Sequence, residues 1–407
     1  MIVDGNRALH LTYCTNIHAG ETWDEVFANV RTHVLAVKAR ICPEREFGIG
    51  LRLSALAARE LALPERLGSF AEFLRDNGLY VFTINGFPYG AFAGRAVKER
   101  VYRPDWLEDE RVAYTDVLAG ILAALVPGDM EGSISSVPGC FRARGGLTDA
   151  GPEIASRLRR HAACAWHLRE SSGRIVTLAL EPEPHCVLET TADAVTFFAQ
   201  HLFCASSVRE FAKLTGLATP DAERALRHHV GVCLDACHAA VEFENPDEAV
   251  ARIVAGGIRV LKVQVSAGLR VLAPNADSLA ALERFAEGVY LHQVVVQRGT
   301  DLRRYVDLPQ ALAHAAGHDD SDPADEWRVH FHVPVFREKL GPFNNTQVFL
   351  RPFLARIARG DVCQHLEVET YSWDVLPEEH RREPVDDAIA RELAWTIDGL
   401  TARSSDR

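Results

Sequence analysis

The sequence lacks the features of several large protein classes. No window in its 407 residues approaches the roughly 18 uninterrupted apolar residues that a membrane-spanning helix needs. The segment from Met1 to Leu11 has neither the basic start nor the apolar core of a signal peptide. We therefore expect a cytoplasmic protein with no stable membrane insertion.

Cysteine pairs and an excess of basic charge are also missing. The nine cysteines are scattered, odd in number, and form no CxxC pair, which favours reduced and mostly buried thiols.

Lys and Arg number 44 against 56 Asp and Glu, a formal charge of −12. An acidic chain has no general attraction for phosphate backbones, so we expect no nucleic-acid partner.

Two familiar enzyme motifs are absent as well. No Gly-rich phosphate loop follows the first expected strand, which counts against a doubly wound open sheet. The stretch Gly132-Ser133-Ile134-Ser135 lacks the GxSxG spacing of a nucleophile elbow.

Strand-like and helix-like segments instead alternate along the whole chain. Eight β-then-α units in order predict a parallel sheet closed into a (β/α)8 TIM barrel, an α/β fold, with residues 1–407 forming one domain. The expected strands are His10–Asn16, Phe47–Ser54, Leu79–Gly86, Gly132–Val137, Arg174–Glu181, Val230–Asp235, Ile258–Ser266 and His365–Thr370.

One region does not fit a single connection between strands seven and eight. Residues 269–343 contain a helical stretch, a predicted hairpin of Tyr290–Val296 with Leu302–Leu308, a polar loop at Gly317–Asp325, and a strand-like piece at Trp327–Phe336. We interpret them as an insertion that decorates the carboxyl-terminal rim of the barrel.

Polar residues end four successive expected strands. Because the carboxyl ends of barrel strands converge on one mouth, these side chains are expected to lie close together. Oxygen-rich ligands with added imidazole suit Mn²⁺, Mg²⁺, Co²⁺ or Zn²⁺, with zinc favoured if histidines join. The predicted ligands of a divalent metal ion are Glu181, Asp235, Gln264, Glu369, His238, His330 and His332.

Each of these residues also has a structural interpretation. Glu181 or Asp235 could cap a helix or form an ion pair. His330 and His332, which share one face of the expected strand Trp327–Phe336, could serve the core or the surface. Glu367 could pair with Lys262 inside the barrel. The residues predicted to bind substrate are His18, Arg52, Asn85, His185, Lys262 and Glu367.

The order Glu, Asp-x-x-His, a polar residue, then Glu at the last four strand ends resembles the xylose-isomerase-like TIM barrels. Within that superfamily, Leu11–Trp23, Val97–Trp106, His330–Pro334 and His365–Tyr371 resemble stretches of the EboE-type metabolite traffic proteins. The resemblance implies that Glu181 and Glu369 act as ligands and catalytic bases, that Asp235 is a ligand, and that His238 binds the metal or a hydroxyl. Gln264 departs from the family, which usually has His there.

Three functions follow from this resemblance. The first is a metal-dependent sugar isomerase or epimerase-like protein acting on a small metabolite within an ebo-type export pathway. The second is a non-catalytic metabolite-binding or escort protein. The third is a phosphodiesterase similar to endonuclease IV, which the net charge disfavours. The implied partners are a small-molecule metabolite and proteins of the same operon, and a homo-oligomer is left open.

Overall fold

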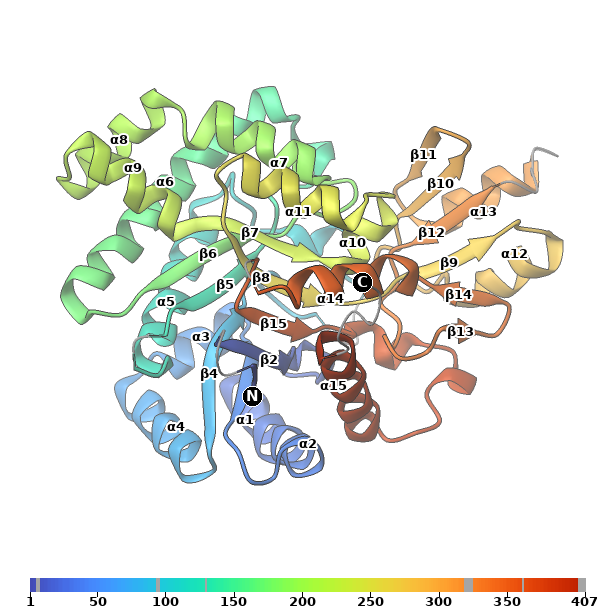
Figure 1. Ribbon diagram of the computed structural model, residues 1–407, viewed down its shortest axis with the longest axis horizontal. Coiled ribbons are helices and arrows are strands. Elements are labelled where there is room, and N and C mark those ends of the chain that lie inside the picture. Colours follow the sequence, from blue (N-terminus) through green and yellow to red (C-terminus); the bar gives the residue numbers. More distant parts are fainter. Residues whose placement is uncertain (5–7, 93–95, 129, 318–324, 361, 402–407) are drawn as a thin grey trace.

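The computed structural model describes residues 1–4, 8–92, 96–128, 130–317, 325–360 and 362–401. Within them, eight parallel strands follow one another around a barrel in the order β2, β15, β8, β7, β6, β5, β4, β3 (Figure 1). The (β/α)8 prediction is therefore confirmed. The barrel strands are β2 (Leu9–Tyr13), β3 (Phe47–Arg52), β4 (Leu79–Asn85), β5 (Gly132–Ser136), β6 (Val176–Leu180), β7 (Val230–Asp235), β8 (Val260–Val265) and β15 (His365–Val368).

The barrel closes between β2 and β3 through a side chain as well as a backbone bridge. Cys14 and Gly50 form a parallel bridge. The Thr12 hydroxyl donates to the Gly48 carbonyl over 2.7 Å and accepts from the Gly50 amide over 3.1 Å. A short strand β1 (Ile2–Asp4) pairs antiparallel with the start of β2. Since closure removes the free sheet edges, all eight strand ends surround one mouth.

Local sequence determines where several helices begin. Thr22 and Glu25 form a capping box at the start of a continuous helical run from Trp23 to Ile41, and Thr190 with Asp193 forms another. Asn245 caps a helix whose first residue is Pro246, a position where the missing amide proton costs nothing. These capped helices pack around the outside of the barrel (Figure 1).

The helices of the barrel layer are α1 (Trp23–Asn29), α2 (Leu35–Ile41), α3 (Ala55–Leu61), α4 (Pro64–Asp76), α5 (Asp109–Leu125), α6 (Leu147–Ser172), α7 (Thr191–Phe197), α8 (Ala205–Thr215), α9 (Thr219–His229), α10 (Ala236–Val241), α11 (Pro246–Ala255), α14 (Gln347–Ile357) and α15 (Val385–Thr401). Among the helices of the described ranges, none is both long and apolar enough to cross a membrane.

The segment between β8 and β15 forms a second, antiparallel sheet beside the barrel mouth (Figure 1). The predicted hairpin is present with shifted bounds, as β10 pairs with β11. The elements of this segment are β9 (Leu269–Leu272), α12 (Ala276–Leu282), β10 (Val294–Arg298), β11 (Asp301–Tyr305), α13 (Leu308–Gly317), β12 (Glu326–Val329), β13 (Lys339–Leu340) and β14 (Phe343–Asn345). Most of the predicted polar loop, residues 318–324, lies outside the described residues.

One strand prediction in this segment is wrong. Only Glu326–Val329 is a strand, and the chain turns at its end, where the Phe331 amide donates to the Val329 carbonyl over 2.8 Å. His330 and His332 therefore follow the strand instead of sharing one of its faces. The cause is that Pro334 and the turn remove ladder donors that a longer strand would need.

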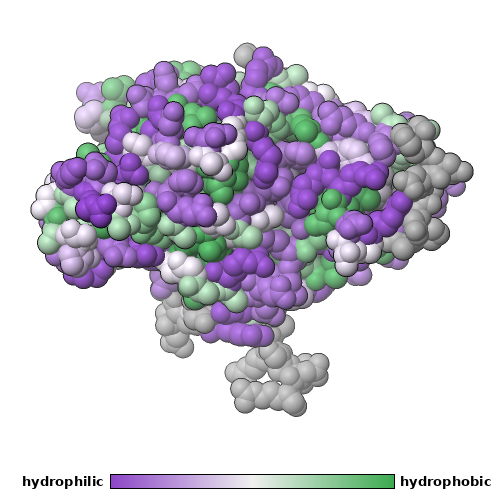
Figure 2. All heavy atoms as spheres, turned by 90° about the horizontal axis from the view of Figure 1, so that it is seen from above, coloured by the Kyte–Doolittle hydropathy of each residue, from purple (hydrophilic) through white to green (hydrophobic). Residues whose placement is uncertain are grey.

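The face seen in Figure 2 is mostly hydrophilic, with hydrophobic residues in small, separate patches. The large hydrophobic side chains that remain exposed are spread over different elements, such as Leu214 of α8, Val254 of α11 and Leu272 of β9.

Candidate metal centre

Three carboxylates meet at the carboxyl end of the barrel. Glu181 directly follows β6, Asp235 ends β7, and Glu369 directly follows β15. One oxygen from each lies within 4.8 Å of the other two, and the residues are only 3%, 2% and 4% exposed. The three acids therefore lie close together, as expected for residues at the carboxyl ends of barrel strands.

The electrostatics of this group favour a cation. Burial, together with the charges of Glu369 and Asp235, raises the pKa of Glu181 well above its usual value. Burial and the charges of Asp235 and Glu367 do the same to the pKa of Glu369. Lys262, the nearby cation, forms its ion pair with Glu367, at 2.6 Å. Three buried acids in one place repel each other unless protons or a metal ion compensate their charge.

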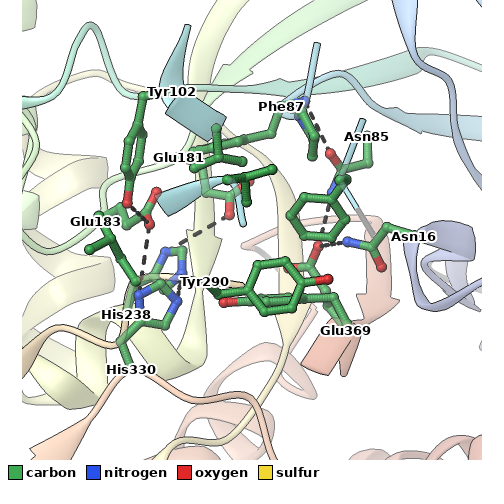
Figure 3. A pocket seen from close by; sticks show the side chains of 16 residues that line it. Asn16, Asn85, Phe87, Tyr102, Glu181, Glu183, His238, Tyr290, His330 and Glu369 are labelled. Carbon is green, nitrogen blue, oxygen red and sulfur yellow. Dashed lines mark hydrogen bonds and ion pairs between the residues drawn. The ribbon is translucent and has the colours of Figure 1, made fainter. Parts of the chain in front are cut away.

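Two amides orient Glu369. The side-chain nitrogens of Asn16 and Asn85 donate to its Oε1 over 2.7 and 2.9 Å (Figure 3). Asn85, predicted to bind substrate, contacts a candidate ligand and also lines the cavity above it. Hydrogen bonds that leave one carboxylate oxygen available are the usual outer support of a metal ligand.

Three histidines stand beside the acids with the same orientation. The Nδ1 atoms of His238 and His332 lie 3.0 and 2.9 Å from the backbone carbonyls of Pro182 and Glu369. A carbonyl can only accept, so each of these Nδ1 atoms carries a proton. His330 places its Nδ1 2.7 Å from the Gln293 side-chain oxygen. Burial lowers the pKa of His330 well below its usual value and that of His332 to about 4, so both rings are neutral.

The donor atoms available at the mouth suit a divalent ion. Glu181 Oε2, Asp235 Oδ2 and His332 Nε2 are buried and have no hydrogen-bond partner. The other Asp235 oxygen accepts from the His238 amide and the Ser266 hydroxyl, so this acid caps α10 and still offers a free oxygen. Asp235 with His238 and His332 forms a further group of close ligand atoms. Such a set of oxygen and imidazole donors matches a divalent metal.

Gln264 lies inside the barrel, next to Asp235 in the strand register. Its side-chain oxygen accepts from the Cys233 thiol over 3.2 Å, and its nitrogen has no partner. The oxygen that would bind a metal is thus engaged by the thiol. His332, which lies beyond β12, places an imidazole nitrogen within 4.8 Å of ligand atoms of Asp235 and His238.

The remaining predicted substrate-binding residues have other neighbours. His18 stacks on His33 at 4.1 Å. The guanidinium of Arg52 donates to the carbonyls of Gly20 and Gly90. His185 donates its amide to Glu189 over 2.8 Å. Among the described residues, these three, Lys262 and Glu367 are outside the lining of the cavity above the acids.

A cavity of about 50 Å³ lies over the carboxylates of Glu181 and Glu369. Its floor is polar, whereas its walls carry several aromatic and aliphatic side chains, among them Phe87, Phe92, Val97, Val101, Tyr290 and Tyr371 (Figure 3). Its lining also includes Glu183, for which the sequence gave rise to no prediction. The sequence could have indicated this residue, because Glu183 follows Glu181 by two residues. In an extended chain, residues two apart point to the same side.

Comparisons with known proteins find similar solved structures at low sequence identity. No protein-family model matches the sequence, and neither does any curated protein. A xylose isomerase-like TIM barrel protein from Mycobacterium smegmatis in complex with magnesium is 12% identical, with 97% of each chain covered and a TM-score of 0.49. The IOLI protein with a binding zinc atom is 12% identical, with 96% of this chain and 98% of that chain covered and a TM-score of 0.45.

A third similar structure is 3-keto-D-glucoside 4-epimerase, YcjR, from E. coli, in its apo form. It is 13% identical, with 95% of this chain and 98% of that chain covered and a TM-score of 0.42. The identities are low throughout, and the barrel assignment rests on the strand order of this chain.

Proposed function

We propose that this protein is a metal-dependent isomerase or epimerase that moves a proton on a small hydroxycarbonyl compound. The observation that carries the proposal is the meeting of three buried acids, Glu181, Asp235 and Glu369, at the carboxyl end of the barrel. Glu181 and Asp235 each have a buried oxygen without a hydrogen-bond partner, and Glu181 and Glu369 line the cavity. When bound there, a divalent ion would polarise a substrate carbonyl and acidify the neighbouring C–H bond.

The two glutamates are placed to exchange that proton. Glu181 and Glu369 follow β6 and β15, which β7 and β8 separate in the barrel wall, so the two acids approach the cavity from different sides. One carboxylate would accept the proton and the other would return it. Asn16 and Asn85 hold Glu369 in position for this transfer.

The cavity walls indicate what surrounds the reacting carbon. Phe92 packs on Tyr290 and Tyr371 at ring-centroid distances of 5.0 and 5.3 Å. These rings exclude water and offer a flat apolar surface to the body of a substrate. We expect a ligand whose polar end meets the acids and whose remaining atoms pack against the rings.

A second candidate function is a metabolite-binding or escort protein that performs no turnover. It is favoured by Gln264, which stands where the sequence resemblance expects His and whose oxygen is occupied by Cys233. The sequence resemblance to EboE-type proteins would place either function in a metabolite export pathway.

Metal analysis combined with isotope exchange tests the proposal. Protein stripped with chelator is reconstituted with Mn²⁺, and bound metal is measured for the wild type, Glu181→Gln and Glu369→Gln. Glu244→Gln is the matched control, since Glu244 is a buried acid that caps α7 through Thr191, away from the acids of the mouth. We expect metal binding by the wild type and the control, and its loss in both site variants.

The catalytic step is tested by deuterium uptake from D2O into a panel of hydroxycarbonyl compounds. Removing one of the two bases should slow exchange by about 10²–10⁴-fold. A wild-type protein that binds no Mn²⁺, Co²⁺ or Zn²⁺ would refute the metal site. Metal binding and ligand binding without any exchange across the panel would establish the binding protein instead.

A further inference from the structure

A buried acid of the last helix contacts two segments of the barrel mouth. Glu392 belongs to α15, which packs against α2 and α14 on the outside of the barrel (Figure 1). Other buried residues of this helix, among them Ala388, Ile389, Leu393 and Leu400, form an apolar face. Glu392 is only 1% exposed, so a carboxyl group interrupts that face.

One oxygen of Glu392 accepts hydrogen bonds from both segments. Its Oε1 accepts from the Thr370 hydroxyl over 2.7 Å and from the Val335 amide over 3.0 Å. Thr370 directly follows Glu369 of the candidate metal centre, and Val335 follows His332 by three residues. The carboxyl group of α15 thus joins the end of β15 to the chain beyond β12.

The two segments that Glu392 joins also contact each other through candidate ligands. The Nδ1 atom of His332 donates to the backbone carbonyl of Glu369 over 2.9 Å. Both residues place a ligand atom within 4.8 Å of one on Asp235. A shift of one segment against the other would therefore separate two ligands that share Asp235 as a neighbour.

The segment that carries His332 follows no regular structure. Residues 330–334 belong to neither a helix nor a strand. Their path depends on individual hydrogen bonds, such as that from the Val333 amide to the Ala267 carbonyl over 2.8 Å. At the end of the segment, the carboxyl group of Glu392 takes the place of the backbone acceptor that a sheet would offer.

The position of Glu392 is unfavourable for a carboxylate. Burial raises the pKa of Glu392 from its ordinary value near 4.5 to about 7. A buried carboxyl group lowers stability unless hydrogen bonds compensate its loss of water. An apolar residue would continue the buried face of α15, but it could not accept the two hydrogen bonds from the mouth.

We propose that Glu392 is a positioning residue, which fixes His332 and Glu369 relative to each other and so determines how tightly the candidate centre binds its divalent ion. The inference rests on the proposed function, because it presupposes a metal ion among these ligands. Glu392 acts through Thr370 and Val335. Replacing a residue that holds metal ligands in place typically weakens metal binding by about 10–100-fold.

The metal affinity of full-length variants tests the inference. Chelator-stripped protein is titrated with Mn²⁺, and the dissociation constant is measured by calorimetry. We expect Glu392→Met, which removes the acceptor at similar volume, to weaken Mn²⁺ binding by about 10–100-fold. Glu392→Gln keeps a side-chain oxygen that can accept both hydrogen bonds, and it should bind Mn²⁺ nearly as tightly as the wild type.

Glu244→Met is the matched control. Glu244 is another buried acid whose Oε1 accepts from an amide and a hydroxyl, in this case both of Thr191 and both over 2.8 Å. Its replacement should lower the free energy of unfolding to a similar extent as Glu392→Met. Mn²⁺ binding should stay unchanged, because Thr191 begins α7 and does not line the cavity above the acids.

The visible absorption of bound Co²⁺ gives a second readout, since it depends on the geometry of the ligands. We expect the spectrum of Glu392→Met to differ from that of the wild type, and the spectra of Glu392→Gln and Glu244→Met to match it. Thr370→Val serves if Glu392→Met does not fold. It removes one of the two donors to Glu392 and should also weaken Mn²⁺ binding.

Wild-type affinity in Glu392→Met, or in Thr370→Val if the former does not fold, would overturn the positioning role and leave the proposed function intact. Equal weakening in Glu392→Met and Glu244→Met would show that metal affinity only follows stability, which would also overturn that role. A wild type that binds no divalent ion would overturn the proposed function together with this inference.

Discussion

Gly50, on β3, faces the buried ion pair between Lys262 and Glu367. A Cβ atom at this position would lie 2.0 Å from a Glu367 oxygen and 2.7 Å from the Tyr13 carbonyl. Neither atom can retreat easily, because the carboxylate is tied to Lys262 and the carbonyl belongs to β2. Glycine is therefore needed here for the close approach of a side chain, and not for its backbone freedom.

We expect Gly50→Ala to lower the free energy of unfolding by about 2–4 kcal/mol, since the added methyl overpacks the barrel interior. Gly68→Ala is the control with the opposite sign. Gly68 lies within α4 with nothing within 4 Å of an added Cβ. Alanine there should add about 0.5–1 kcal/mol through helix propensity. Urea denaturation of both variants checks the pair, and equal stabilities would show that the interior has room.

At the scale of elements, β8 and β15 are joined by the same ion pair. Lys262 Nζ lies 2.6 Å from Glu367 Oε2, and both side chains are fully buried. Lys262 also donates to Ser135 of β5, on the opposite part of the wall. Burial alone would lower the pKa of Lys262, but the Glu367 carboxylate outweighs it and raises that pKa above its ordinary value. The ion pair suggested by the sequence thus links strands across the interior of the barrel.

Replacing only one residue of the Lys262–Glu367 ion pair should lower the free energy of unfolding more than replacing both. Lys262→Met leaves a buried carboxylate without its cation and should destabilise the protein by about 3–5 kcal/mol. The double variant Lys262→Met with Glu367→Gln removes that charge and should recover part of the loss. A double-mutant cycle of unfolding free energies measures the coupling, and strictly additive losses would contradict it.

Much of the barrel could be predicted from the sequence because each strand is an apolar run that ends at a polar residue. The same rule located Glu181, Asp235 and Glu369. It could not assign the roles of Asn16 and Asn85, because their contact with Glu369 exists only once the barrel has closed. Long-range pairing of this kind leaves no local periodicity to detect.

The inserted segment is harder to predict. Its hairpin follows from the sequence pattern, but the same pattern places His330 and His332 on a strand that ends before them. Glu183 escapes detection because Pro182 and Pro184 on either side make the stretch look like an ordinary loop. In both places the chain is irregular, and its geometry is determined by tertiary contacts and not by local propensity.

At the scale of the whole molecule, the end of the barrel opposite the candidate metal centre holds two buried histidines. His10 of β2 and His365 of β15 are in register on neighbouring strands. Their Nδ1 atoms lie 2.8 Å from the Tyr80 hydroxyl and 2.9 Å from the Ser133 hydroxyl. Burial lowers the pKa of His10 to about 4 and that of His365 to about 3. The folded barrel therefore keeps both rings neutral.

This pair should make the fold sensitive to acid. Between pH 6.5 and about 3, these two histidines bind protons in the unfolded chain but stay neutral in the folded chain. Their contribution to the free energy of unfolding is therefore complete above pH 6.5 and decreases as the pH falls. The loss should reach a few kcal/mol, because each tenfold difference in proton affinity between the folded and unfolded chain is equivalent to about 1.4 kcal/mol. Unfolding free energies measured across this range should fall less steeply in His10→Gln with His365→Gln.

His167→Gln is the control for that experiment, because His167 is an exposed residue of α6. Its pH profile should follow the wild type. A double variant whose profile also follows the wild type would show that other groups govern the acid response.

The hydrogen bond from Asn16 to Glu369 joins residues 353 positions apart, and it has a consequence for biosynthesis. A ribosome adds roughly 5–20 residues per second, so Asn16 waits tens of seconds for its partner. During that time β2 has no β15 beside it, and the acids of β6 and β7 have emerged without Glu369. The nascent chain thus cannot bring the three acids of the candidate metal centre together until nearly the entire polypeptide has been synthesised.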